Sequence, residues 1–233
     1  IEVSYRKNFE GEPTGKTHPE LLQLKPSHGH DMSIVNGISR IGYMKGGGKA
    51  LWKDENIADS IAAYAINWME ERVNVAQQAS HCRKGECDHT RRSEANRPFF
   101  MYLCTNDVHV PRWPHARFKG KSPMGLRGDA ILQLDWTVGQ ITASLQRLGI
   151  ADNTLIILTS DNGPVLDDGY ADDAETLAGE HRPSGHWRGG KYSAFEAGSA
   201  VPFIVSWPDG KVPQGKTSRA LVSQIDAMRS LAA

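Results

Sequence analysis

The sequence predicts an α/β domain, in which strands buried in a sheet alternate with helices that cover it. Two short apolar runs, Phe99 to Cys104 and Leu155 to Thr159, have the length and the aromatic or β-branched content of buried strands. Between them, residues 129–148 carry apolar side chains at helical spacing. A strand, a helix and a second strand in this order predict a βαβ unit with two parallel strands and a right-handed crossover.

The other elements are predicted from the same kinds of pattern. The helix over 129–148 has an apolar stripe at spacings of three and four, made of Ile131, Leu134, Val138, Ile141, Leu145 and Leu148. Gly149 follows at the position where helices commonly end. An earlier helix after Asp54 presents one face made of Ile57, Ile61, Tyr64, Ala65 and Trp68. A further strand is predicted over Val201–Trp207, and a capping box at Ser223–Asp226 opens a last helix.

Length, charge and cysteine content narrow the possible classes of protein. The 233 residues are enough for one large domain with a real core. The 27 basic and 27 acidic residues balance, so no nucleic-acid partner is indicated. No apolar stretch has the length of a membrane span. Three cysteines predict no disulfide framework. Because the chain begins at Ile1 and ends within a helical pattern, we interpret it as an internal piece, and its compartment stays unknown.

Residues 72–97 are polar and without period, and we expect them to form an insertion loop. Within them, His81 to His89 contains two histidines and two cysteines. This cluster could hold zinc or form a disulfide clip, although its spacing is not that of a known zinc finger. The alternative is a solvated loop without a metal, and the sequence does not decide between the two.

Polar residues follow both predicted strands where each strand ends. Asp161 and Asn162 come directly after the second strand, and His109 lies just past the first. Since parallel strands end at the same edge of a sheet, where ligands collect, we expect these three side chains to lie close together. Carboxylate and amide oxygens suit calcium or magnesium. An ordinary Asx turn would also explain the Asp-Asn-Gly sequence.

A glycine-rich basic segment follows further along the chain. Lys191 stands directly after Gly189 and Gly190, which would let the backbone approach a ligand closely. A lysine in this setting could neutralise an anion. The alternative is a solvated basic loop.

Taken together, these motifs resemble the sulfatase family of the alkaline phosphatase superfamily, in its arylsulfatase-like branch. The motifs are Pro98 to Leu103 with Asn106 to Pro111, Asp129 to Ile131 with Asp135 and Gly139, Thr159 to Pro164, and Arg188 to Ser193 with Glu196 to Gly198. The resemblance covers residues 98 to about 210 well and 31–71 less well, and 72–97 departs from it. It implies an alkaline phosphatase-like fold, a mostly parallel sheet with helices on both faces. Residues 1–233 would be part of its single catalytic domain.

The resemblance also implies roles for six residues. Asp161 and Asn162 would be metal ligands. His109 and Lys191 would be catalytic. His181 and Arg188 would lie in the substrate pocket. The metal would be one catalytic calcium ion. His109 would hydrogen-bond the sulfate ester and help to protonate the leaving oxygen. The lysine would neutralise a sulfate oxygen and assist the same departure.

The family's nucleophile is a formylglycine made from Cys or Ser in a Cys/Ser-x-Pro/Ala-x-Arg signature. That signature is absent, since Ser93 to Arg97 fits it only loosely and lies in the insertion. We therefore expect it upstream, carrying either Cys or Ser, and we expect these residues alone to be inactive. The resemblance further implies a formylglycine-generating or sulfatase-maturing enzyme as a partner, and a periplasmic or secreted location.

The predicted function is hydrolysis of a sulfate ester on a carbohydrate or an aryl group. One alternative is a phosphoester or phosphonate hydrolase of the same superfamily. Many two-zinc members place histidine after the metal-binding aspartate, whereas Asn162 favours one hard cation. The other alternative is an inactive homologue that binds glycans. Neither the sugar and its sulfated position nor the oligomeric state follows from the sequence.

Overall fold

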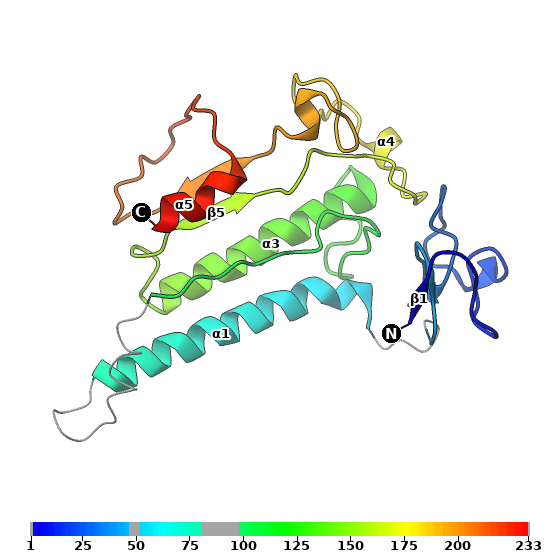
Figure 1. The fold of residues 1–233 in the computed structure, drawn as a ribbon, viewed down its shortest axis with the longest axis horizontal. Coiled ribbons are helices and arrows are strands. Elements are labelled where there is room, and N and C mark those ends of the chain that lie inside the picture. Colours follow the sequence, from blue (N-terminus) through cyan, green and yellow to red (C-terminus); the bar gives the residue numbers. More distant parts are fainter. Residues whose placement is uncertain (1, 47–51, 81–97, 233) are drawn as a thin grey trace.

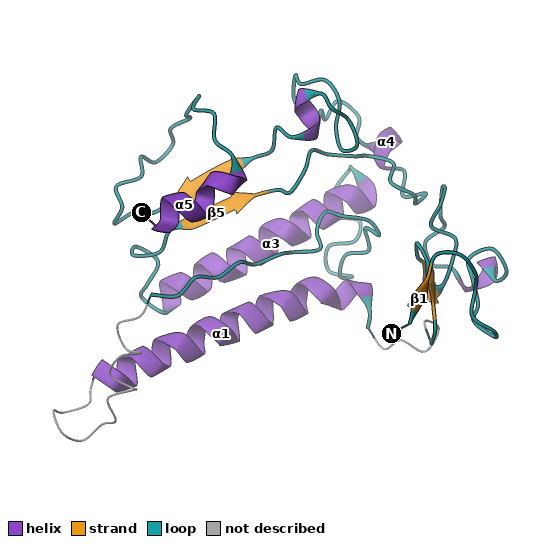
Figure 2. Cartoon of the chain, viewed as in Figure 1, coloured by secondary structure: helices purple, strands orange, loops and turns teal. Residues whose placement is uncertain are grey.

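The computed structural model describes residues 2–46, 52–80 and 98–232. Two long helices, α1 (Ile57–Ser80) and α3 (Gly125–Arg147), lie side by side and contact each other along their length (Figure 1). In the view of Figure 2 the strands β5 (Ile156–Thr159) and β6 (Phe203–Ser206) lie with α5 (Ala227–Ala232) above α3, and α1 lies below it. None of the described helices is long and apolar enough to cross a membrane.

The remaining elements are short. They are β1 (Val3–Ser4), β2 (Ile34–Val35), β3 (Ile38–Ser39), β4 (Tyr43–Met44), α4 (Ala174–Leu177) and 3₁₀ turns at Pro19–Leu21, Asp54–Asn56, Glu196–Gly198 and Gln224–Asp226. The predicted last helix is confirmed as α5, but the side chain of Ser223 makes no capping hydrogen bond. Residues 72–80 of the expected insertion continue α1, while 81–97, including the His81–His89 cluster, lie outside the described residues.

All three sheets of the described residues are two-stranded and antiparallel: β1 with β4, β2 with β3, and β5 with β6. In the last pair Ile156 lies opposite Ser206 and Thr159 opposite Phe203. The predicted strands at 155–159 and 201–207 are therefore confirmed. Residues 156–158 are only half-buried, however, so this strand is not covered on both faces as its apolar run suggested.

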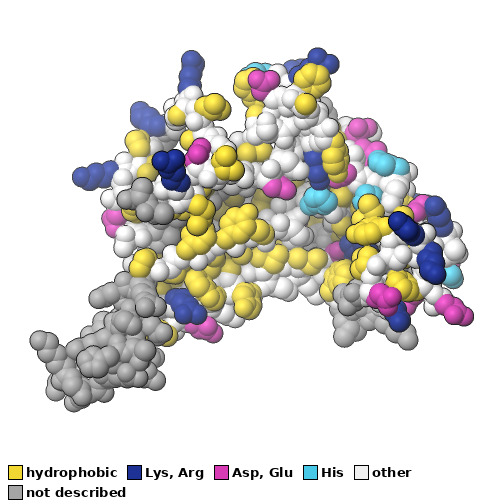
Figure 3. All heavy atoms as spheres, viewed as in Figure 1, with side chains coloured by type: hydrophobic (Ala, Val, Ile, Leu, Met, Phe, Trp, Pro, Cys, Tyr) yellow, Lys and Arg dark blue, Asp and Glu magenta, His cyan; other side chains and the backbone are white. Residues whose placement is uncertain are grey.

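Residues 99–104, predicted as the parallel partner of this strand, are not a strand in the described structure, and that prediction is wrong. Phe99 packs edge-on against Trp68 of α1 with ring centroids 5.5 Å apart, while Phe100 is 60% and Tyr102 83% exposed. On the face of the molecule seen in Figure 3, hydrophobic side chains gather in a band. Aromatic content favours an extended backbone, but a strand also needs a neighbour that completes its hydrogen bonds, and β5 pairs with β6 instead.

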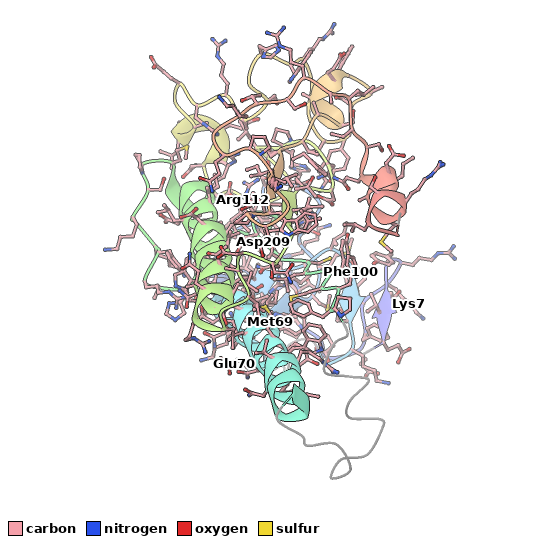
Figure 4. The ribbon with its side chains drawn as sticks, turned by 90° about the vertical axis from the view of Figure 1, so that its left-hand side faces the viewer. Lys7, Met69, Glu70, Phe100, Arg112 and Asp209 are labelled. Atoms are coloured by element: carbon pink, nitrogen blue, oxygen red, sulfur yellow. The ribbon has the colours of Figure 1, made fainter. Side chains whose placement is uncertain are left out.

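The buried faces of the long helices coincide only in part with their predicted apolar stripes. The buried apolar residues of α1 are Ala58, Ala62, Ala65, Met69 and Val73, and Tyr64 from the predicted face is 77% exposed. On α3 the stripe is mostly half-buried, and only Leu145 of its six residues is fully buried. Small side chains let neighbouring elements approach closely, so alanines occupy the contact although they weigh little in a hydrophobic pattern. Figure 4 shows Met69 where α1 meets α3.

The N-terminal segment docks onto the loop that follows β5. Leu24, Ile38, Val110 and Tyr170 form one buried cluster, with Trp113 and Leu126 packed against it. The Tyr170 hydroxyl donates a hydrogen bond of 2.6 Å to the carbonyl of Ser39. Backbone bonds from Ser27 to Gly169 and from Ala171 to Lys25 continue the contact. Segments far apart in the sequence are thus fixed together directly beside residues 167–168.

Tyr170 gives the fold a predictable response to alkaline pH. Burial raises the pKa of Tyr170 from its ordinary value near 10 to about 12. In that window the unfolded chain loses the phenolic proton first, so stability falls as pH rises from 10 to 12. We expect Tyr170→Phe in the full-length protein to remove this part of the fall. At pH 7 it should cost about 1 kcal/mol, because the hydrogen bond is lost.

Urea unfolding at pH 7 and at several values between 9.5 and 11.5 measures this difference. Tyr5→Phe is the matched control, because the Tyr5 side chain is mostly exposed. Parallel pH profiles of Tyr170→Phe and the wild type would contradict the prediction.

Candidate functional site

The turn after β5 and the glycine-rich loop around Lys191 are locked together by their backbones. The amide of Lys191 donates to the carbonyl of Pro164 at 2.9 Å, and the amide of Gly163 donates to that of Gly198, also at 2.9 Å. A Cβ atom on Gly163 would collide with the carbonyl of Ala197. Only glycine permits this approach. The loop geometry thus places Lys191 beside the turn that begins at Asp161.

Lys191 and His109 meet at this place. The Lys191 Nζ lies 2.9 Å from the His109 Nε2, although the two residues are 82 positions apart. The predicted proximity of His109 and the Asp161 turn is therefore indirect. Among the described residues, no hydrogen bond or ion pair joins His109 to Asp161 or Asn162. Lys191 connects the two regions, since its backbone bonds to Pro164 of the turn and its side chain contacts His109.

The hydrogen bonds of His109 fix its tautomer. Its Nδ1 lies 2.7 Å from the carbonyl oxygen of Val110, and a carbonyl can only accept, so Nδ1 carries the proton. In the neutral imidazole, Nε2 is then an acceptor and receives a hydrogen bond from the ammonium of Lys191. A proton therefore lies between the two side chains.

A carboxylate on the other side of Lys191 was not among the residues predicted from the sequence. Asp168 Oδ2 lies 3.4 Å from the Lys191 Nζ, and both side chains are largely buried, with 12% and 15% exposed. The hydroxyl of Tyr192 donates to the other oxygen of Asp168 at 3.0 Å. The sequence carries Asp167 and Asp168 side by side, and only the fold shows which of them faces the lysine.

The segment that carries His109 is anchored by a buried ion pair. Arg112 Nη1 lies 2.7 Å from Asp172 Oδ2, with 2% of each side chain exposed. The same guanidinium donates to the carbonyls of Val165 and Leu166 at 2.9 and 2.8 Å. Figure 4 shows Arg112 in the interior beside α3. Since removing one partner would leave a buried charge unpaired, this pair fixes the distance between the His109 segment and the loop after β5.

A second anchor holds the same segment to α3. The Nε2 of Gln133 donates to Asp107 Oδ2 at 3.0 Å, and its Oε1 accepts from the amide of His115 at 2.8 Å. Burial raises the pKa of Asp107, and the hydrogen bond from Gln133 opposes that rise. His109 thus lies on a short segment that is tied down on both sides, as a precisely positioned side chain requires.

Comparison with models of protein families shows to which family the chain belongs. The family model described as Sulfatase matches residues 14–233, nearly the whole chain. The chain belongs to the sulfatase family. The resemblance inferred from the motifs is thereby confirmed.

Individual relatives agree with this family. An N-acetylgalactosamine-6-O-sulfatase of Bacteroides thetaiotaomicron is 51% identical over 233 residues, which is 100% of this chain and 41% of the relative. A steryl-sulfatase of Rattus norvegicus is 37% identical over 141 residues, 60% of this chain and 24% of the relative. An N-acetylgalactosamine-6-sulfatase of Canis lupus familiaris is 38% identical over 136 residues, 58% and 24% respectively. The sulfatase chain thus spans about two fifths of the length of the first of these relatives.

A solved structure confirms the fold class. It comes from work on the metabolism of multiple glycosaminoglycans by Bacteroides thetaiotaomicron. It superposes with a TM-score of 0.85 at 50% identity, covering 99% of this chain and 43% of that one. The sulfatase chain is therefore part of an alkaline phosphatase-like α/β domain, and the small sheets described above belong to that domain.

The predicted metal ligands of this sulfatase have suitable chemistry. Asp161 is exposed, and its Oδ1 accepts a hydrogen bond of 3.0 Å from the Nδ2 of Asn162. Turning the Asn162 amide would present its oxygen beside the carboxylate, and two hard oxygens suit calcium. Within residues 2–46, 52–80 and 98–232, no group of three or more His, Cys, Asp or Glu side chains is placed to hold a metal. Because calcium takes six to eight oxygen ligands, the pair would be only part of its ligand set.

The two predicted pocket residues of the sulfatase occupy different surroundings. His181 lines a cavity of about 380 Å³ together with Pro164, Glu175 and Ser184, adjacent to the Asp161 turn. Arg188 does not line this cavity, and its guanidinium stacks over the ring of Phe195 at 3.9 Å from the centroid. The structure therefore brings His181 to a concave site and gives Arg188 a contact within its own loop.

Proposed function

We propose that the full-length protein hydrolyses a sulfate ester on a carbohydrate, with the 6-sulfate of N-acetylgalactosamine as the first candidate. The observation that carries the proposal is the contact between His109 and Lys191 beside the Asp161 turn. The choice of sugar rests on the 51% identical relative, which is named an N-acetylgalactosamine-6-O-sulfatase. The neighbouring cavity lined by His181 and Glu175 offers the polar groups that a sugar ring needs.

The two side chains suit the difficult part of this reaction. When the bond between sulfur and the bridging oxygen breaks, the leaving oxygen becomes an alkoxide that needs a proton, and water supplies the new oxygen on sulfur. The proton held between Lys191 Nζ and His109 Nε2 can pass to that alkoxide. The ammonium of Lys191 also neutralises negative charge on the sulfate, and a half-buried site strengthens that interaction.

Two components lie beyond what these residues supply. Asp161 and Asn162 would hold the divalent cation, which would supply positive charge to the sulfate group. The attacking nucleophile, by family resemblance a formylglycine, would be made by a maturing enzyme from a residue outside this sequence. The described side chains then orient the ester and provide the proton for the leaving group.

The test is to express the full-length protein together with a sulfatase-maturing enzyme and to measure release of inorganic sulfate. Substrates are the 6-sulfates of N-acetylgalactosamine and N-acetylglucosamine, the 4-sulfate of N-acetylgalactosamine, 4-nitrophenyl sulfate and 4-nitrophenyl phosphate. We expect sulfate release to be fastest from the first sugar. Faster cleavage of the phosphate would support a phosphoesterase instead. Binding of the sugars without turnover by the matured protein would support an inactive glycan-binding homologue.

A further inference from the structure

We propose that Asp168 is the positioning residue of this site, which holds Lys191 in register with His109, and that Tyr192 fixes Asp168 in turn. This inference deepens the proposed function and rests on it. Its starting point is a chain of three contacts that runs from the Tyr192 hydroxyl through Asp168 and Lys191 to His109, with distances of 3.0, 3.4 and 2.9 Å.

The number of donors on Lys191 supports this role. An ammonium group has three N–H donors and no acceptor. In the part of the chain that the structure describes, one donor faces His109 Nε2 and one faces Asp168 Oδ2. The third remains for an oxygen of the sulfate. With two partners in fixed directions, the third donor has a defined direction, whereas a lysine side chain without partners samples many rotamers.

Burial distinguishes this contact from a surface ion pair. The side chains of Asp168 and Lys191 are 12% and 15% exposed, so water screens their attraction less than it screens exposed pairs. Asp167, the adjacent carboxylate, is 41% exposed and faces the other way, toward Ser27 and His28. One of two neighbouring acidic residues is therefore directed at the lysine.

The backbone of the loop is shaped for the same contact. Tyr192 has a φ of 72°, which lies in the left-handed region that residues other than glycine rarely adopt. Its ring is 79% exposed and has the Lys191 ammonium 5.2 Å from its centroid, so burial of the ring does not explain this conformation. The conformation instead delivers the hydroxyl to Asp168, next to the backbone bond from Lys191 to Pro164. Such local strain is common where a side chain must be held for function.

The test is a double-mutant cycle in the matured full-length protein, with an alkyl sulfate ester whose leaving group needs a proton. We expect Asp168→Asn to lower kcat/KM about 10- to 100-fold, mostly through kcat, and Tyr192→Phe to lower it less, about 2- to 5-fold. Adding Asp168→Asn to Lys191→Ala should cost less than about 3-fold more, because the carboxylate acts through the lysine. Asp168→Glu should recover part of the loss.

Asp167→Asn is the matched control and should stay within about 2-fold of the wild type, because that carboxylate does not contact Lys191. A multiplicative loss in the double mutant would show that Asp168 acts independently of Lys191 and would overturn the proposal. Wild-type kinetics in Asp168→Asn would overturn it as well.

A second readout does not depend on turnover. Brief labelling with acetic anhydride, followed by mass spectrometry, measures how accessible the Lys191 amine is. We expect labelling of Lys191 to rise several-fold in Asp168→Asn and to stay unchanged in Asp167→Asn, since only the first change releases the lysine. If the wild type released no sulfate from any substrate, the proposed function would fail. Equal labelling in all three proteins would reject the role of Asp168 separately.

Discussion

Asp161→Ala in the matured full-length protein should reduce kcat/KM for sulfate-ester hydrolysis at least about 100-fold, or roughly 2.7 kcal/mol of transition-state stabilisation. The exposed carboxylate stands at the end of β5 beside Asn162, where it would bind the cation and supply fixed negative charge to it. Its removal should weaken cation binding and misplace the sulfate. Steady-state kinetics with added calcium and measurement of bound calcium by mass spectrometry test both effects.

Three further variants show whether such a loss is specific to a metal ligand. Asp152→Ala removes an exposed carboxylate that precedes β5, and its kinetics should match the wild type. Asn162→Asp keeps an oxygen ligand and should lose less activity than Asn162→Ala. Normal turnover of Asp161→Ala, with an unchanged calcium content, would reject the assignment of this turn as a metal site.

The turn and the basic loop could be predicted from the sequence because each one is a local pattern. An apolar run that ends in Asp-Asn-Gly indicates a strand end by itself, and β5 confirms it. Glycines beside Lys191 indicate a close approach to a ligand, and the approach that the structure shows is to the protein's own backbone, since a Cβ on Gly190 would collide with the carbonyl of Pro164. Neither pattern needs knowledge of a distant partner.

Pairing between distant segments could not be predicted in the same way. Residues 99–104 have strand composition, but their backbone has no ladder partner among the described residues, while β5 pairs with β6 in the antiparallel sense. A βαβ order in the sequence favours a parallel pair, yet hydrogen-bond partners depend on which strands reach the same edge. The prediction failed on this topological step and not on local propensity.

The residues that sequence reasoning missed are those whose role depends on a single long-range contact. Asp168 and Asp167 are equivalent in sequence, and Arg112 is one basic residue among 27. Their importance follows from the buried contacts to Lys191 and Asp172. The sequence held one signal for Arg112. It lies three residues after His109 and directly after Pro111, which constrains the backbone there. That signal alone names no partner.

Lys191→Ala should produce the largest loss of all on substrates with poor leaving groups. In the proposed mechanism it removes a charge that would face the sulfate and also the partner of His109 Nε2, so we expect kcat/KM for an alkyl or sugar sulfate to fall about 10³-fold. In His109→Ala, kcat/KM for the same substrates should fall about 10²-fold. On 4-nitrophenyl sulfate, whose leaving group needs little protonation, both losses should shrink to about 10-fold.

The measurement is a leaving-group series of aryl and alkyl sulfates, with log kcat/KM plotted against the pKa of the leaving alcohol. Both variants should show a steeper negative slope than the wild type, because protonation of the leaving oxygen is lost. Lys121→Ala, which removes an exposed lysine from the loop before α3, should keep the wild-type slope. Equal losses across the series would mean that Lys191 and His109 only bind the sulfate, and the proton held between them would then have no part in the departure of the alkoxide.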